Sequence, residues 1–181
     1  EAALYEIRTA LGDEFTQLPM VTVVGDVKHA ALVEDVLERE KPNVVFHAAA
    51  YKHVPLMEET NAWQAVRNNA YGTWVIARAS VAAKVEKFVL VSTDKAVNPT
   101  SVMGASKRLA EIVCQTLQGG GTAFVVVRFG NVFGSAGSVI PRFREQIARG
   151  GPVTVTHPDI TRYFMRSEEH TSELQSLARI S

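Results

Sequence analysis

The sequence predicts an α/β domain built on a parallel, doubly wound sheet, and two features of its 181 residues carry this prediction. Short runs rich in β-branched residues recur along the chain, and longer segments with apolar residues at every third or fourth position lie between them. Strands that alternate with helices in this way are typical of a parallel sheet joined by crossover helices. No internal repeat or long linker interrupts the pattern, so we expect a single core.

Four runs are predicted to be strands, because each is rich in β-branched residues and bounded by turn residues or by a predicted helix. These runs are residues 21–24, 44–46, 88–91 and 123–127. Helical spacing of apolar residues predicts helices over residues 30–39, 61–83 and 105–117. The glycines of "QGGGT", residues 118–122, can adopt positive φ and are predicted to end the third helix.

Composition excludes several classes of function. Lys plus Arg and Asp plus Glu balance at 19 each, so no nucleic-acid partner is expected. The single cysteine, Cys114, excludes a disulfide framework and a CxxC metal pair, and His47 has no second histidine at metal-ligand spacing. We therefore expect no metal and interpret His47 as a structural histidine at a strand end. A reducing, cytoplasmic compartment fits this composition best.

Membrane contact is not expected from this chain. No apolar run approaches the roughly 18 residues that a spanning helix needs, and the start of the sequence, "EAALYEIRTA", lacks the basic and apolar regions of a signal peptide.

Small and polar residues follow the first two predicted strands. Asp26 could accept a hydrogen bond from an adenine amino group, or it could cap the next helix. Ala48, Ala49 and Ala50 could let a flat ligand approach the backbone, or they could reflect close packing of a helix on the sheet. The residues alone leave both alternatives open at each place.

Asp94 and Lys95 stand side by side just beyond the predicted strand 88–91. Open α/β sheets usually carry their chemistry at the carboxyl ends of the strands, so this pair could be an acid and a base. A solvated ion pair that caps the strand is the alternative.

Six blocks of sequence together resemble a known family, the extended short-chain dehydrogenases that dehydrate UDP-N-acetylglucosamine in polysaccharide and protein glycosylation. In order, they are "GDV", "HAAAYKHVPLMEE", "NNAYGT", "STDKAVNPTSVMGASKR", "RFGNVFGSAGSVIPRF" and "ITRYFM". The joined "STDKA" and "GASKR" are the most specific part. The resemblance implies an incomplete Rossmann-like fold, tightly bound NAD, a UDP-sugar substrate and a homo-oligomer in the complete protein.

The resemblance also implies roles for individual residues. The catalytic set is Thr93, Asp94, Lys95 and Lys107, with Lys95 as base, Asp94 as acid and Lys107 on the nicotinamide ribose. NAD would be bound by Asp26, Val27, Ala48, Ala49, Ala50, Ser92 and Lys107. The nucleotide sugar would be bound by Lys52, Asn131, Ser138, Pro141, Phe143 and Arg162, together with a diphosphate loop containing Gly130, Gly134 and Gly137.

Met103 departs from the pattern of most short-chain dehydrogenases, which have a Tyr four residues before the Lys. A thioether has no proton to exchange, so the proton of the sugar's 4-hydroxyl must leave through Thr93 or a water. Met at this position resembles the larger, membrane-anchored members, which would place the complete protein on the cytoplasmic face of the inner membrane. An inactive enzyme is the alternative, which the intact "TDK" disfavours.

The two ends of the sequence also depart from the family. No GxGxxG occurs, although the family opens with a strand, that glycine loop and a helix. We therefore expect residues 1–165 to form a partial NAD-binding and catalytic domain with the start of the nucleotide-sugar part, and to bind NAD weakly alone. Residues 166–181, "RSEEHTSELQSLARIS", are interpreted as a non-native tail.

Two other functions compete with dehydration: epimerisation of a nucleotide sugar, and non-catalytic regulation by dinucleotide binding. Asp94 and Lys95 favour dehydration, because simple 4-epimerisation needs the Tyr that Met103 replaces, and a regulator needs neither side chain.

Overall fold

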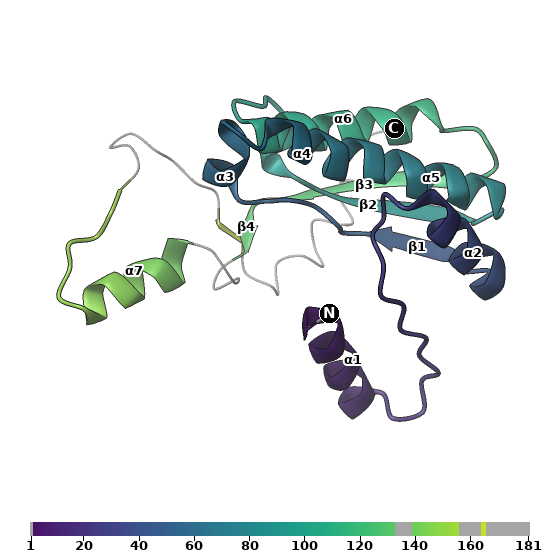
Figure 1. The fold of residues 1–181 in the computed structure, drawn as a ribbon, viewed down its shortest axis with the longest axis horizontal. Coiled ribbons are helices and arrows are strands. Elements are labelled where there is room, and N and C mark those ends of the chain that lie inside the picture. Colours follow the sequence, from purple (N-terminus) through teal and green to yellow (C-terminus); the bar gives the residue numbers. More distant parts are fainter. Residues whose placement is uncertain (1, 133–138, 156–163, 166–181) are drawn as a thin grey trace.

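The structure is a computed structural model that describes residues 2–132, 139–155 and 164–165 (Figure 1). Helices and strands alternate through the middle of the chain. In order, the elements are α1 (Ala2–Glu14), α2 (Ala30–Glu40), β1 (Val44–His47), α3 (Val54–Glu58), α4 (Ala62–Val66), the π-helical η1 (Arg67–Tyr71), α5 (Gly72–Ala82), β2 (Lys87–Thr93), the 3-10 turn η2 (Asp94–Ala96), α6 (Val102–Thr116), β3 (Ala123–Phe129), β4 (Asn131–Val132), α7 (Val139–Ala148) and β5 (Phe164–Met165).

β1, β2 and β3 form a parallel sheet in that order, which confirms three of the four predicted strands and the α/β, Rossmann-like prediction. Val45 pairs with Phe88, and Ser92 pairs with Arg128. A second, two-stranded parallel sheet joins β4 to β5. The carboxyl ends of all three strands therefore lie at the same end of the larger sheet, where β3 is followed directly by β4.

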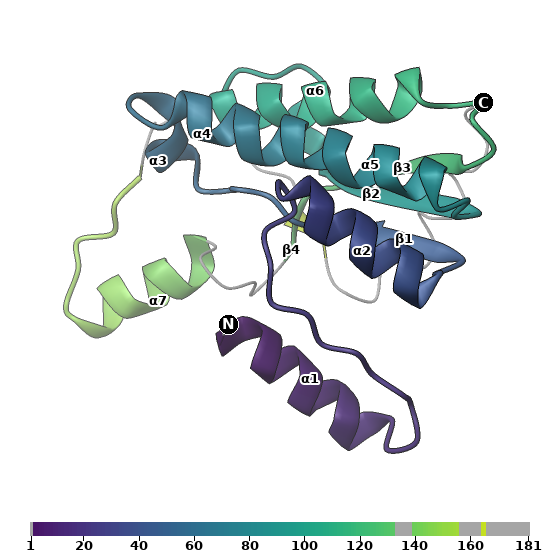
Figure 2. The same ribbon diagram turned by 45° about the vertical axis from the view of Figure 1, so that its right-hand side comes forward.

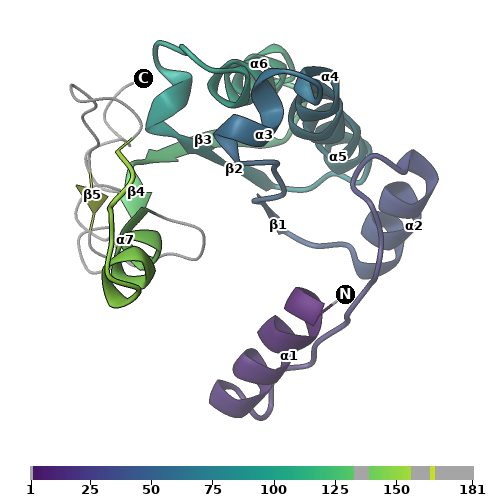
Figure 3. The ribbon, with the colours of Figure 1, turned by 60° about the vertical axis from the view of Figure 1, so that its left-hand side comes forward.

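The described helices α2, α4, α5 and α6 lie on one face of the larger sheet (Figures 1 and 3). Strand side chains alternate between the two faces, so Phe88 and Leu90 of β2 are fully buried beneath these helices. The core cluster consists of Val33, Leu37, Val45, Val75, Ala77, Ala79, Val85, Phe88, Leu90, Ala110 and Cys114. The opposite face carries Phe46, which is 72% exposed.

The predicted strand at residues 21–24 is wrong. These residues form neither a helix nor a strand, and Val21 and Val24 are 65% and 70% exposed. A strand is stable only when its backbone groups pair with a neighbour, and no strand of the described ranges lies beside this run. Helix α1 likewise buries none of its residues and stands apart from the sheet (Figure 2).

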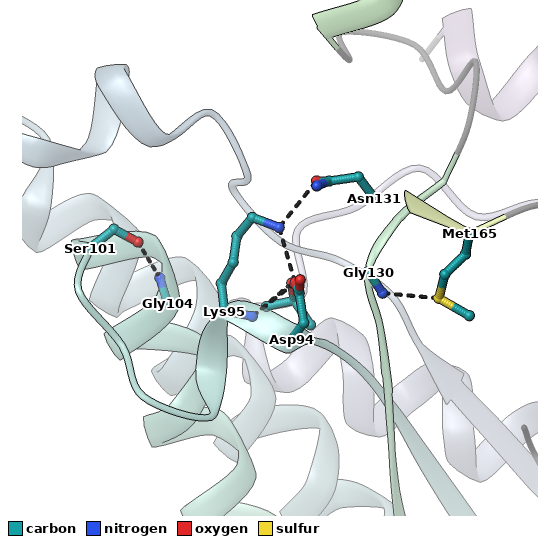
Figure 4. A network of polar contacts seen from close by, with 8 residues as sticks. Asp94, Lys95, Ser101, Gly104, Gly130, Asn131 and Met165 are labelled. Atoms are coloured by element: carbon teal, nitrogen blue, oxygen red, sulfur yellow. Dashed lines mark hydrogen bonds and ion pairs between the residues drawn. The ribbon is translucent and has the colours of Figure 1, made fainter. Parts of the chain in front are cut away.

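The predicted helix 61–83 forms as a succession of α4, η1 and α5 with a π-helical turn at its centre. This turn buries Asn68, Asn69 and Ala70. The predicted helix 105–117 begins earlier, at Val102, because the Ser101 side chain accepts a hydrogen bond from Gly104 N at 3.1 Å (Figure 4).

The predicted end of α6 at the "QGGGT" glycines is confirmed. Helix α6 ends at Thr116, and Gly119 and Gly121 take φ of 94° and 92°.

Candidate active site at the carboxyl ends of the strands

Thr93 is the last residue of β2, and its side chain caps the short turn η2 that follows. The Lys95 amide donates to Thr93 Oγ1 at 3.4 Å and to Asp94 Oδ1 at 2.9 Å. Capping fixes the backbone of η2, so Asp94 and Lys95 are held at the tip of the strand.

Lys95 Nζ lies 2.9 Å from Asp94 Oδ1 and 3.1 Å from Asn131 Oδ1 (Figure 4). Thr93 Oγ1 also donates to Asp94 Oδ1, at 2.9 Å. The side chains of Lys95 and Asp94 are 30% and 32% exposed, so both contact the protein and remain open to a ligand. The structure thus brings four of the predicted site residues together at the carboxyl end of β2. They are Thr93 of β2, Asp94 and Lys95 of η2, and Asn131 of β4.

Asn131 is held in place by the strands that follow β3. It begins β4 and pairs with Phe164 of β5, while Gly130 N donates to Met165 Sδ at 3.1 Å (Figure 4). The short second sheet therefore orients the residue that reaches Lys95.

Lys107 lies one helical turn after Met103 on α6, and both side chains are buried. Its Nζ donates to Val91 O at 2.7 Å, and no second acceptor for this ammonium occurs among the described residues. Burial lowers the pKa of Lys107, although Glu111 opposes the shift. The ammonium therefore lies beside the carboxyl end of β2, and the predicted contact of Lys107 with a ribose hydroxyl stays a prediction.

Gly104 explains how α6 comes so close to the site. A Cβ at this position would meet Lys95 O at 2.5 Å, so only glycine allows the first turn of α6 to pack against η2.

His47 ends β1 and is buried, as the interpretation of a structural histidine requires. Its Nε2 lies 3.0 Å from Thr73 Oγ1, whose hydroxyl donates to Asn69 O at 2.6 Å. The Thr73 proton is used by this second bond, so Nε2 carries the proton of the neutral imidazole. Burial lowers the pKa of His47 to about 4, and the charge of Lys107 acts in the same direction.

Asn69, which the sequence analysis did not single out, positions the loop after β1. Its side chain accepts from Tyr51 N at 2.8 Å and donates to Tyr51 O at 3.1 Å and to Ser106 Oγ at 2.9 Å. The only sequence signal for Asn69 is its position in the "NNAYGT" block that resembles the family.

The loop that Asn69 holds carries four predicted ligand-binding residues. Ala48 and Ala49 are exposed and Ala50 is half-buried, which argues against the alternative of close helix packing. Lys52 is also exposed.

The helix-cap alternative for Asp26 is wrong. The N-cap of α2 is His29, whose Nδ1 accepts from Leu32 N at 3.2 Å. Asp26 instead accepts from Lys28 N at 2.9 Å and pairs with Lys28 Nζ at 2.8 Å. The hydrogen bond from the Lys28 side chain lowers the pKa of Asp26, which remains an exposed carboxylate. Val27 beside it is half-buried.

The remaining predicted residues are not gathered at this site. The Ser92 side chain is buried on the helix side, where its hydroxyl donates to Glu111 Oε1 at 2.6 Å. Pro141 is exposed and Phe143 half-buried on α7, which is set apart from the larger sheet (Figures 1 and 2). Ser138, Arg162, Gly134 and Gly137 lie outside the described residues.

No three His, Cys, Asp or Glu side chains within the described ranges gather so that they could hold a metal ion. None of the helices in the part of the chain that the structure describes has the length and apolar character that a membrane crossing requires.

Comparison with known proteins places these features in a family. The family model described as "Polysaccharide biosynthesis protein" matches residues 1–177. Capsular polysaccharide biosynthesis protein CapD of Staphylococcus aureus is 51% identical over 172 residues, which cover 93% of this chain and 28% of CapD. A UDP-glucose 4-epimerase of Rickettsia rickettsii is 40% identical over 146 residues, covering 78% of this chain and 42% of the epimerase.

Solved structures share the fold. Pen from Bacillus thuringiensis superimposes with a TM-score of 0.82 at 34% identity, over 98% of this chain and 55% of Pen. DesIV, a dTDP-glucose 4,6-dehydratase from Streptomyces venezuelae solved with NAD bound, gives a TM-score of 0.79 at 22% identity, over 92% of this chain and 57% of DesIV. The chain spans less than a third of CapD and little more than half of either structure. It belongs to the polysaccharide biosynthesis protein family, and its fold is that of the extended short-chain dehydrogenases.

Proposed function

We propose that the whole protein to which this chain belongs dehydrates a UDP-N-acetylhexosamine to its 4-keto-6-deoxy sugar, using NAD, for polysaccharide or glycoconjugate biosynthesis. One observation carries the proposal: Asp94 and Lys95 contact each other at the tip of β2 and are only partly covered. The names of CapD and DesIV support the pathway and the type of chemistry.

The reaction needs one base and one acid at neighbouring carbons. NAD, when bound beside Lys107, would supply a reversible hydride acceptor for C4 of the sugar and a hydride donor for C6. The C4 ketone acidifies the C5 proton, which a base removes while an acid protonates the C6 hydroxyl that leaves as water.

The Asp94–Lys95 contact can supply both groups. As an ion pair the two side chains hold the wrong protonation states, an ammonium and a carboxylate. Transfer of one proton along the 2.9 Å contact gives a neutral amine and a carboxylic acid. Lys95 then takes the C5 proton and Asp94 gives its proton to the leaving hydroxyl, which returns the pair to the charged state.

Two further protons complete the balance. The 4-hydroxyl proton leaves through Thr93 or a water, because Met103 cannot accept it. After hydride return, Lys95 reprotonates C5, and a solvent proton restores the pair.

The other residues are proposed to have the roles that the family resemblance implies. Lys107 would hold the nicotinamide ribose, and the exposed Asp26 carboxylate the adenine amino group. The backbone of residues 48–50 would face the dinucleotide, while Lys52 and Asn131 lie on the sugar side. A homo-oligomer at the cytoplasmic face of the membrane is part of the same proposal.

Epimerisation is the second candidate, because the Rickettsia rickettsii relative is named a UDP-glucose 4-epimerase. Met103 weighs against it, since it supplies no hydroxyl beside Lys107.

The test is to incubate the purified whole protein with UDP-N-acetylglucosamine, without added NAD, and to follow the sugar by NMR. The proposal predicts a 4-keto-6-deoxy product. A C4 epimer alone would identify an epimerase, and an unchanged sugar would leave the regulator as the better account.

A further inference from the structure

Glu111 is a fully buried carboxylate that the proposed chemistry does not use. It accepts hydrogen bonds from Ser92 Oγ at 2.6 Å, from Arg128 Nε at 2.8 Å and from Arg108 Nη1 at 2.9 Å. Arg128 Nη2 donates to its second oxygen, so the Arg128 contact is bidentate. A buried charge costs several kcal/mol unless it is paired in this way.

The carboxylate remains ionised in the folded protein. Burial raises the pKa of Glu111, but the hydrogen bonds from Arg128, Ser92 and Arg108 outweigh it, and the net shift is downward.

Two of the three partners of Glu111, Ser92 and Arg128, lie on one rung of the sheet next to the site. Ser92 of β2 pairs directly with Arg128 of β3, and Glu111 holds both from the helix side. Asp94 follows Ser92 by two residues, and Asn131 follows Arg128 by three. Four residues before Glu111, the Lys107 ammonium donates to the Val91 carbonyl of β2. Helix α6 therefore contacts the two rungs that precede Thr93 and Phe129, the last pair of β2 and β3.

We propose that Glu111 is a positioning residue for the Asp94–Lys95 pair: it holds the ends of β2 and β3 so that Asn131 meets Lys95. The proposal rests on the function proposed above. Glu111 is 0% exposed and the pair is about one-third exposed, so Glu111 acts through Ser92 and Arg128 rather than on a bound sugar.

The test uses Glu111→Gln and Ser92→Ala in the whole protein. Gln keeps the shape of Glu but removes the charge that pairs with Arg128. Ser92→Ala removes only one hydrogen-bond donor to Glu111. If Glu111→Gln does not fold, Ser92→Ala still tests the proposal. Asp35→Asn is the matched control, because the Asp35–Arg39 ion pair is exposed on α2. Turnover and KM for UDP-N-acetylglucosamine are measured well below each unfolding midpoint.

We expect Glu111→Gln to lower kcat roughly 10- to 100-fold with KM within about threefold, as expected for a displaced catalytic pair. Ser92→Ala should follow in the same direction more weakly, and Asp35→Asn should match the wild type. Hydrogen exchange of peptides 88–96 and 124–132 should accelerate in Glu111→Gln and in Ser92→Ala but not in the control.

The two measurements separate this proposal from the proposed function. A wild-type protein that converts no nucleotide sugar would refute the function, and hydrogen exchange alone would then decide the role of Glu111. Unchanged exchange at both strand ends in both variants, or a kcat that falls only with the folded fraction, would overturn the positioning role.

Discussion

The ammonium of Lys95 lies between the Asp94 carboxylate and the Asn131 amide, beyond the carboxyl end of β2. The Lys95 side chain is partly exposed there. An ion pair exposed to this degree contributes only about 0 to 1 kcal/mol to folding. The contribution of this ion pair to the free energy of folding is therefore too small to explain its position at the strand tip. The proposed acid–base role explains that position better.

His47 gives the chain a pH-dependent stability. In the unfolded chain it takes up a proton near its ordinary pKa of 6.5, but burial keeps it neutral in the folded protein down to about pH 4. The unfolded state therefore binds more protons in this window, and the free energy of unfolding should fall by up to about 3 kcal/mol as the pH drops through it.

Urea unfolding of the chain at pH 7, 5.5 and 4.5 measures this effect. His47→Gln should flatten the dependence between pH 6.5 and 4. His53→Gln is the control, since His53 is exposed and its side chain makes no cap hydrogen bond. An equal pH dependence in wild type and His47→Gln would contradict the assignment.

Sequence reasoning singled out Thr93, Asp94 and Lys95 because they are adjacent at the end of an apolar run, and the structure shows that they contact one another. It missed Glu111, because two of its partners, Ser92 on β2 and Arg128 on β3, are 19 and 17 residues away in sequence. It placed Ser92 in the cofactor site, yet the alternation of strand side chains turns this residue toward the helices.

At the scale of elements, α6 organises the site. Its first turn packs against η2 at Gly104, and its next turns hold β2 through Lys107 and Glu111. The amphipathic spacing of apolar residues predicted the helix, but the polar contacts on its buried side could not be read from that spacing.

Gly104→Ala tests how closely α6 must pack. The new Cβ would lie 2.5 Å from Lys95 O, so helix and turn must separate, and the free energy of unfolding should fall by about 1 to 3 kcal/mol. Gly12→Ala on α1 is the control, because its Cβ would meet only Met20 Cε at an ordinary 3.6 Å. Urea unfolding of both variants gives the comparison, and a Gly104→Ala chain as stable as Gly12→Ala would count against close packing.

Two elements show where periodicity fails as a guide. Residues 21–24 have strand composition but no strand beside them in the described part of the chain, so pairing rather than propensity decides. The π-helical turn at residues 67–71 inserts one extra residue into a helix. The spacing of apolar residues changes too little for the sequence to reveal this turn.

At the scale of the whole molecule, α2, α4, α5 and α6 cover one face of the larger sheet, and the opposite face, called the open face here, carries no such layer of helices in the described part of the chain (Figure 3). Phe46 on the open face is 72% exposed, whereas Phe88 under the helices is fully buried. The alternation of strands and helices predicted the sheet, while the division into a covered and an open face appears only in three dimensions.

Two Phe substitutions should separate these faces. Phe88→Ala should destabilise the chain by about 3 to 5 kcal/mol, since it empties a packed core position. Phe46→Ser should change the free energy of unfolding by less than about 1 kcal/mol, because little burial is lost. Urea unfolding of the chain measures both, and equal losses would show that the open face is covered in solution.

The central claim is that Lys95 is the base and Asp94 the acid, and isotope exchange in D₂O tests it most directly. The whole protein is incubated with UDP-N-acetylglucosamine, and deuterium at C5 and formation of the keto sugar are followed by NMR and mass spectrometry. Lys95→Ala should lose C5 exchange and slow product formation by roughly 100-fold or more, while Asp94→Asn should exchange C5 but stall before water leaves. Full C5 exchange in Lys95→Ala would contradict the account.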